Sequence, residues 1–215
     1  MATGIFLNFK SQRVHMLPNL LLVGAAKSGT TSMANFLSKS EQIYIPSIKE
    51  CRFFSKLDKN YVGLGAEVFV NSGVTDFDDY CDLFRSRREK IIADFSNDYL
   101  YYHQRAVPEI LKVLGPETKI IIVLRNPVDR AFSNYLHSIR EGWENLSFMQ
   151  ALESEGERIA KHWAWSYHYS NAGFYYEAVK AYMQNFNNVK VILFEELENS
   201  VRDEGFYEFL GVKND

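Results

Sequence analysis

Four apolar runs, separated by longer amphipathic stretches, organise this chain. The runs at 20–24, 91–94, 119–124 and 189–194 consist mainly of Leu, Ile and Val. Such nearly continuous apolar runs are typical of strands buried on both faces. Between and after them, apolar residues recur at helical spacing, which predicts helices at 32–37, 76–88, 105–114, 128–141, 147–161, 174–186 and 205–210. Alternating strands and helices predict an α/β fold of three layers, α/β/α, around a central parallel sheet.

The segment after the first helix has a different pattern. Residues 43–45 read as a short strand that Pro46 ends, and residues 47–75 have no clear period. Glycines at 63, 65 and 73 interrupt this stretch, which we expect to be an irregular, flap-like segment over a site. A length of 215 residues is typical of one domain, so 1–215 is read as a single domain.

The first apolar run passes into Gly24-Ala-Ala-Lys-Ser-Gly-Thr-Thr31, a glycine-bounded loop rich in hydroxyls. Gly24 and Gly29 allow a tight turn and close approach of the backbone to a ligand. A strand, a glycine loop and a helix N-terminus together present N–H groups and a positive dipole end to an anion. The sequence therefore predicts a phosphate cradle on a P-loop-type sheet.

The order of residues in this loop argues against a nucleoside triphosphate as its ligand. In G-x-x-x-x-G-K-[ST] the lysine directly follows the second glycine and the next hydroxyl holds magnesium. Here Lys27 precedes Gly29 by two residues, and threonines follow that glycine. Arg125 follows the 119–124 run, where a magnesium-dependent NTPase usually has an Asp. This pattern favours direct charge pairing with phosphate and no metal.

A second anion-binding pattern begins at Arg125. Pro127 suits the first turn of a helix, and Arg130 and Ser133 lie three positions apart on that helix. Arg125 comes at the C-terminal end of a strand, where open α/β sheets bind ligands. An arginine there and a serine on the next helix can together hold a monophosphate.

These two patterns resemble a known family. Residues 24–31 are similar to the 5′-phosphosulfate loop of sulfotransferases that use 3′-phosphoadenosine 5′-phosphosulfate (PAPS), and residues 125–133 are similar to their 3′-phosphate motif. Pro46-Ser-Ile-Lys-Glu-Cys-Arg-Phe-Phe54 resembles a segment of the heparan-sulfate-like and bacterial branch. Residues 93–100, 135–152, 173–175 and 209–212 also resemble segments of this family, and they occur in the family's order along the chain. The resemblance therefore covers roughly residues 17–212.

The resemblance implies a transferase that moves a sulfonyl group from PAPS to an acceptor hydroxyl or amine and releases PAP. Lys27 would stabilise the leaving phosphate, Lys49 would contact the sulfonate, and Asp94, which aligns with a family Glu, would be the general base. His137 and His103 are alternative bases, Glu50 could also face the site, and Asp94 could instead be a structural hydrogen-bond acceptor. The implied nucleotide-binding residues are Lys27, Ser28, Gly29, Thr30, Thr31, Ser32, Arg125, Ser133 and Tyr175.

Composition narrows the possible partners. The formal net charge is −3, which excludes a generic nucleic-acid binder and gives no support for a strongly polyanionic acceptor. Cys51 and Cys81 form no spaced framework for disulfides or a metal, and the N-terminal residues have no apolar stretch of signal-peptide or membrane-anchor length. We therefore expect a cytoplasmic enzyme with reduced thiols, no metal, and a small-molecule or carbohydrate acceptor. Neither the acceptor nor the oligomeric state follows from the sequence.

Two other functions stay open. The sequence ends at Asp215, just after Phe209-Leu-Gly-Val212, whereas relatives usually continue with a basic loop over the 3′-phosphate. A catalytically weak PAP-binding or nucleotide-binding remnant of the family is therefore one alternative. A P-loop kinase acting on a small molecule is the other, and the missing Gly-Lys-[Ser/Thr] counts against it.

Overall fold

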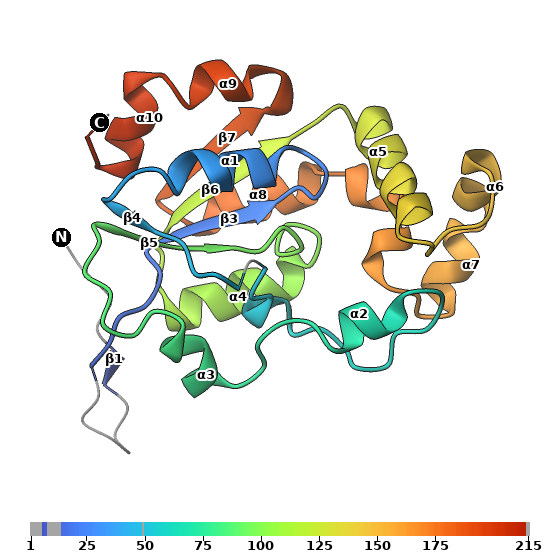
Figure 1. Cartoon of the computed structure of the whole chain (residues 1–215), viewed down its shortest axis with the longest axis horizontal. Helices are drawn as coiled ribbons and strands as arrows, with labels where there is room; N and C mark the ends of the chain where they lie inside the picture. The colour runs from blue at the N-terminus through green and yellow to red at the C-terminus, as the bar shows by residue number, and fades with distance from the viewer. Residues whose placement is uncertain (1–5, 8–13, 49, 214–215) are drawn as a thin grey trace.

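A five-stranded parallel sheet forms the centre of the structure, a computed structural model that describes residues 6–7, 14–48 and 50–213. Its strands lie in the order β4-β5-β3-β6-β7 (Figure 1). Their bounds are Ile43–Tyr44 (β4), Ile91–Phe95 (β5), Leu20–Gly24 (β3), Lys119–Leu124 (β6) and Asn188–Leu193 (β7). All four principal strands predicted from the apolar runs are confirmed, as is the α/β class. The first strands, β1 (Phe6–Leu7) and β2 (Val14–His15), pair antiparallel outside this sheet.

Helices cover both faces of the sheet because alternate strand residues point to opposite sides. On one face, Leu21 and Ile120 pack in a core with α3 (Phe77–Asp82), α4 (His103–Val113) and α8 (Tyr176–Asn185). On the other face, Leu22 and Ile121 pack in a core with α1 (Thr30–Leu37), α9 (Leu197–Ser200) and α10 (Glu204–Leu210). Figure 1 shows α1, α9 and α10 above the sheet and α4 below it. The predicted three layers are present.

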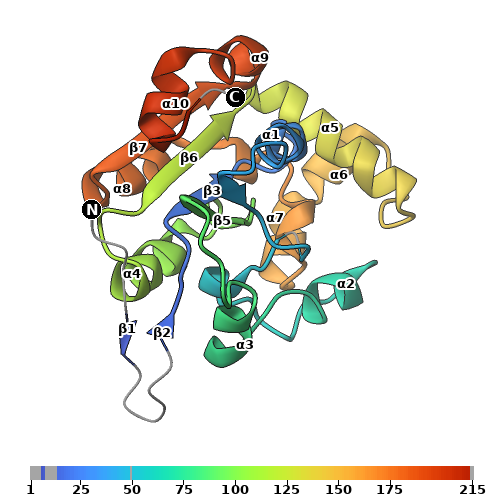
Figure 2. The same cartoon turned by 60° about the vertical axis from the view of Figure 1, so that its left-hand side comes forward.

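A third group of elements lies beside the sheet. It contains α2 (Ala66–Val70), α5 (Pro127–Arg140), α6 (Phe148–Glu153) and α7 (Glu155–Ala160), and both views place α2 and α6 at the right-hand side (Figures 1 and 2). The rest of this group is irregular chain with 3₁₀ turns at Trp165–Tyr167 and Asn171–Gly173. Its core is largely aromatic and includes Phe69 and Tyr169. We call residues 57–71 and 141–173 together the aromatic wall.

Some predicted helix bounds were wrong. The expected helix 147–161 is two helices that meet at Ser154, whose Oγ donates to the Gln150 carbonyl at 2.8 Å and competes with helix continuation. The expected helix 76–88 ends at Asp82, although its start is well marked by Asp76, which accepts from two backbone N–H groups. The segment 47–75 is not wholly irregular, since it contains α2 and a 3₁₀ turn at Phe53–Ser55.

Candidate active site

The loop between β3 and α1 has a backbone shape that favours small residues. Lys27 and Gly29 have φ of 67° and 83°, in the left-handed region. A Cβ on Gly29 would lie 2.8 Å from the Leu197 side chain and 2.9 Å from the Phe194 ring, so only glycine fits without a shift. The Ala25 N–H donates to the Val123 carbonyl at 2.7 Å, which ties the loop to β6. The N-terminus of α1, with no acidic residue in its first turn, therefore has a fixed position beside this loop.

Arg125 brings the second phosphate motif to the same place. It follows β6, and its Nη1 donates to the Lys27 carbonyl at 3.3 Å. Its guanidinium lies over the Phe194 ring at 4.7 Å, and the Tyr175 hydroxyl donates to the Arg125 carbonyl at 3.1 Å. α5 begins directly afterwards because Pro127 occupies its first turn and the Asn126 side chain accepts from the Val128 N–H. The two sequence motifs are thus adjacent in space.

A cleft of about 480 Å³ opens at this junction. Besides the loop and Arg125, its lining carries four further ionisable side chains, and the rest of the surface is polar and aromatic. Glu50 is the single carboxylate among the described residues that line it, against several cations. The net charge of the chain, a sum over the whole surface, therefore did not reveal a locally basic cleft. The lining residues are Ala26, Lys27, Gly29, Thr30, Thr31, Glu50, Arg52, Val68, Phe69, Asn97, Arg125, Asn134, His137, Arg140, Trp143, Trp165, Ser166 and Phe194.

The Glu50 carboxylate is held firmly in this cleft. Its Oε1 accepts from Asn97 Nδ2 at 2.6 Å and its Oε2 accepts from Arg52 Nη2 at 2.6 Å. The Glu50 N–H donates to the Phe95 carbonyl at 3.0 Å, which anchors the turn to the end of β5. The side chain keeps 21% of its surface exposed, so the carboxylate can still reach a ligand. Its position and chemistry suit a general base.

His137 also lines the cleft, but its ring nitrogens are less suited to accept a proton. Burial and the charges of Lys27 and Arg140 lower the pKa of His137, which keeps the ring neutral at pH 7. Arg140 Nη2 lies 2.7 Å from His137 Nδ1, and because an arginine can only donate, Nδ1 accepts and Nε2 carries the ring proton. A neutral His137 is then a hydrogen-bond donor at Nε2, which leaves Glu50 as the better base.

The expectation that Asp94 is the base needs correction. Asp94 is completely buried and does not line the cleft. Its Oδ2 accepts from the Tyr80 and Tyr99 hydroxyls at 2.9 and 2.8 Å, and its Oδ1 accepts from Ser96 Oγ at 2.8 Å. Burial raises the pKa of Asp94. Ser96 Oγ in turn accepts from the Arg52 N–H at 3.0 Å, so Asp94 supports the turn that carries Glu50.

The remaining predicted residues have varied positions. Lys49 lies outside the described residues. Ser28 is buried, Ser32 is exposed, and Ser133 and Tyr175 are half-buried, and none of these four lines the cleft. Arg130, one turn before Ser133 on α5, is completely buried. His103 lines a different pocket.

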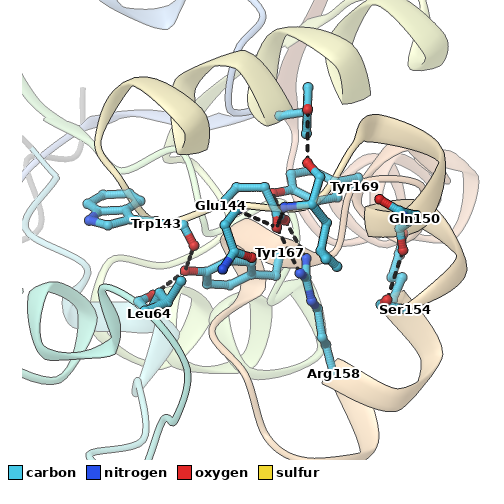
Figure 3. A network of polar contacts seen from close by, with 12 residues as sticks. Leu64, Trp143, Glu144, Gln150, Ser154, Arg158, Tyr167 and Tyr169 are labelled. Atoms are coloured by element: carbon cyan, nitrogen blue, oxygen red, sulfur yellow. Dashed lines mark hydrogen bonds and ion pairs between the residues drawn. The ribbon is translucent and has the colours of Figure 1, made fainter.

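The aromatic wall completes the cleft with Trp143, Trp165 and Phe69. A buried ion pair holds it (Figure 3): Glu144 accepts from Arg158 Nη1 at 2.5 Å and Nη2 at 3.0 Å. The Tyr169 hydroxyl donates to the same carboxylate at 3.0 Å, and the Tyr167 hydroxyl donates to the carbonyls of Leu64 and Trp143. These contacts join three segments far apart in the sequence, which no local pattern could indicate.

Close packing on glycine positions the tryptophans of the wall. A Cβ on Gly65 would lie 2.5 Å from the Trp143 ring, and one on Gly63 would lie 2.5 Å from the Trp163 ring. The two indoles therefore lie directly against backbone that carries no side chain. Two of the three glycines that interrupt the predicted flap-like segment, Gly63 and Gly65, are thus contact surfaces of the wall.

Among the described residues, no group of three or more His, Cys, Asp or Glu side chains is placed to hold a metal ion. No helix in the described part of the chain has the length and apolar character needed to cross a bilayer.

Comparison with known proteins gives consistent matches. The family model for the sulfotransferase domain matches residues 17–215. The crystal structure of a sulfotransferase from Alicyclobacillus acidocaldarius superposes with a TM-score of 0.87 at 40% identity, over 93% of this chain and 83% of that one. Among curated proteins, the membrane-associated sulfotransferase kil1 of Dictyostelium discoideum is 32% identical over 66% of this chain. Human bifunctional heparan sulfate N-deacetylase/N-sulfotransferase 2 is 31% identical over 69% of it.

The chain spans only 27% and 16% of the lengths of those two curated relatives. The match to the family model nevertheless covers nearly the whole chain and includes both phosphate motifs and the turn that carries Glu50. This protein belongs to the sulfotransferase domain family.

Proposed function

We propose that this protein transfers a sulfonyl group from PAPS to a hydroxyl or amine of a small-molecule or carbohydrate acceptor. The observation that carries the proposal is the convergence of Lys27, Arg125 and Glu50 on one cleft. Family membership and the 40%-identical solved sulfotransferase support the same chemistry.

The residues of the cleft fit a nucleotide that carries phosphate at both its 5′ and its 3′ position. Gly29 has the left-handed φ that leads the loop into α1, and the backbone N–H groups at the start of that helix can lie against an anion. Lys27 and Arg125 add positive charge on either side of that loop, joined by the hydrogen bond between Arg125 Nη1 and the Lys27 carbonyl. We assign the 5′ end to the loop and the 3′-phosphate to Arg125 with Ser133. Tyr175 supports that region through the Arg125 carbonyl.

PAPS, when bound, supplies the sulfonyl group on a phosphate leaving group. Lys27 then neutralises charge on the phosphate oxygen, an electrostatic role typically worth about 10²–10³ in rate. Glu50 accepts the proton of the acceptor hydroxyl or amine, and general-base help of this kind contributes about 10²–10⁴. Arg52 and Asn97 hold the Glu50 carboxylate, while the buried Asp94 supports their turn through Ser96.

The acceptor side of the cleft suits a ring-bearing acceptor with negative charge. Trp143 and Trp165 provide flat apolar surfaces on which a sugar or aryl ring can pack. Arg140 at the rim can pair with an acidic group on such a ring. A cytoplasmic location is part of the proposal, in keeping with the unpaired, buried thiols of Cys51 and Cys81.

Calorimetric titration tests the nucleotide class first. The purified chain is titrated with PAP in EDTA, and separately with ATP and magnesium. We expect PAP to bind without metal and ATP not to bind. Lys27→Ala should weaken PAP binding, whereas Lys39→Ala, at an exposed lysine, should not. ATP binding with magnesium and no PAP binding would favour a kinase, and PAP binding without transfer to any acceptor would favour a non-catalytic nucleotide-binding protein.

A further inference from the structure

A second, smaller cavity of about 200 Å³ lies next to the cleft. We call it the rear pocket, and its lining includes Asn97, His103, Arg130, Trp165 and Ala172. Asn97 and Trp165 also line the cleft, so one wall separates the two cavities. The volume is several times the roughly 30 Å³ of one water and below the roughly 300 Å³ at which drug-sized ligand sites begin. The rear pocket therefore suits a small ion rather than a nucleotide.

Arg130 brings a buried positive charge to this wall. Its side chain is completely buried, and its Nη2 donates to the Tyr169 carbonyl. Its Nε and Nη1 have no hydrogen-bond partner, and within the described part of the chain no carboxylate forms an ion pair with it. Burial lowers the pKa of Arg130, and the charge of the buried Glu155, which forms no ion pair with it, acts in the opposite direction. A buried charge without an ion-pair partner is unfavourable in general, so this position favours an anion.

Further polar atoms of the same lining also lack partners. Trp165 Nε1, which can only donate, and His103 Nδ1 are buried and unpaired among the described residues. Asn97 Oδ1 is likewise unpaired, and it must be the acceptor end of the amide because Nδ2 donates to the Glu50 carboxylate. Buried polar atoms are normally satisfied, so several orphans around one cavity point to a ligand that both accepts and donates.

A hydrogen phosphate ion has this combination. Its oxygens accept from Arg130 and Trp165, and its remaining hydroxyl donates to Asn97 Oδ1. Sulfate, fully ionised at neutral pH, offers only acceptors and would leave Asn97 Oδ1 unsatisfied. These polar atoms are buried although their residues line the pocket, so binding requires rotation of the Arg130 and Trp165 side chains.

We propose that the rear pocket binds a protonated tetrahedral oxyanion, with inorganic phosphate as its simplest form, against Arg130. Because Asn97 also holds Glu50, an occupant of this pocket fixes the amide that orients the carboxylate in the cleft. Binding itself does not depend on the proposed sulfonyl transfer, whereas the effect on Glu50 rests on it.

Phosphate titration of the Lys27→Ala variant tests the site, since this change weakens anion binding at the loop. We expect one phosphate per chain, bound several-fold more tightly than sulfate at equal ionic strength. Ala172→Leu, which fills the pocket, should weaken phosphate binding about tenfold or more, and Ala160→Leu at an exposed helix end should not. Arg130→Met should have the same effect as Ala172→Leu, and the latter keeps the test valid if loss of Arg130 prevents folding.

Crystals of the Lys27→Ala variant soaked in arsenate give an independent result. An anomalous peak next to Arg130 and Trp165 is expected, and it should be absent in Ala172→Leu. No phosphate binding by Lys27→Ala, binding that Ala172→Leu leaves unchanged, or arsenate only at the Gly24–Thr31 loop would each overturn the proposal. None of these outcomes depends on PAP, so they can be separated from a failure of the proposed function.

Discussion

The two sides of the cleft are built in different ways. The phosphate side consists of β3, β6 and the loops that follow them, and main-chain contacts such as Ala25 N–H to the Val123 carbonyl hold it. The aromatic wall is held by side chains, among them the Tyr167 hydroxyl, which reaches Leu64 across 103 positions of sequence. The comparison indicates that the loop we propose for anion binding is encoded locally, and that the wall we propose for the acceptor is encoded in distant pairs.

The largest effect is expected on the phosphate side, from Lys27→Ala. Removal of this charge should lower sulfonyl transfer by about 10³, the upper end of the range for such a role, because charge on the leaving phosphate then loses the cation of the loop. Thermal unfolding should be nearly unchanged, since the loop is held by its backbone. Steady-state rates with a transferring acceptor measure the loss, with Lys39→Ala as control. Activity within tenfold of the unsubstituted chain would show that Arg125 or another cation performs this role.

The next two variants distinguish a carboxylate that takes part in the reaction from one that stabilises the fold. Glu50→Gln should lower turnover by about 10²–10⁴ and leave PAP affinity intact, because it removes the base and keeps the shape. Asp94→Asn should instead lower the free energy of unfolding by about 1–3 kcal/mol, since it disturbs a buried acceptor of three hydroxyl hydrogen bonds. Single-turnover rates and urea unfolding distinguish the two. Full turnover in Glu50→Gln would transfer the base role to His137.

A fourth variant tests the ion pair that holds the aromatic wall. Arg158→Met leaves the buried Glu144 carboxylate without its cation and should lower the free energy of unfolding by about 3–5 kcal/mol. Adding Glu144→Gln should restore part of that loss, because the unpaired charge is then removed. Lys161→Met, which breaks the exposed pair with Glu157, is the control and should leave stability unchanged. Equal effects of Arg158→Met and Lys161→Met would show that the buried pair does not hold the wall.

The smallest expected effect is a pH dependence of the wall. Burial lowers the pKa of His168 to about 4, whereas the ordinary value is 6.5. Between these values the unfolded chain binds a proton that the folded chain does not, so stability falls as pH drops from about 6.5 to 4. His168→Gln should remove this part of the dependence, of the order of 1–3 kcal/mol. Urea unfolding at pH 7 and pH 5 measures it, and an unchanged difference between the two pH values would contradict the assignment.

The sequence predicted the sheet and the position of the loop between its first principal strand and the helix that follows, because both depend on short-range patterns. The run 119–124 and its following Arg125 lie as expected, and the loop packs against Phe194 as only a glycine at 29 allows. Asp94 was misassigned because an aligned position at a strand end does not reveal which way the side chain points. Here it points toward Tyr80 and Tyr99 in the core.

Glu50 was within reach of sequence reasoning, since it lies in the Pro46–Phe54 segment that carries part of the family resemblance. What the sequence lacked was the partner set, because Asn97 is 47 positions away. The break at Ser154 and the basic cleft were missed for related reasons. A helical period continues through a competing serine, and a net charge averages over separate surfaces.

The contact between Gly65 and Trp143 has a consequence for how this family could diversify. The indole rests on a residue with no side chain, so a substitution at position 65 would push a cleft-lining ring out of place while leaving every reacting group untouched. Selection, or a protein engineer, could in this way alter the size of the molecule admitted through a flanking segment alone. New acceptor preferences would then arise at positions that an inspection of the catalytic residues overlooks.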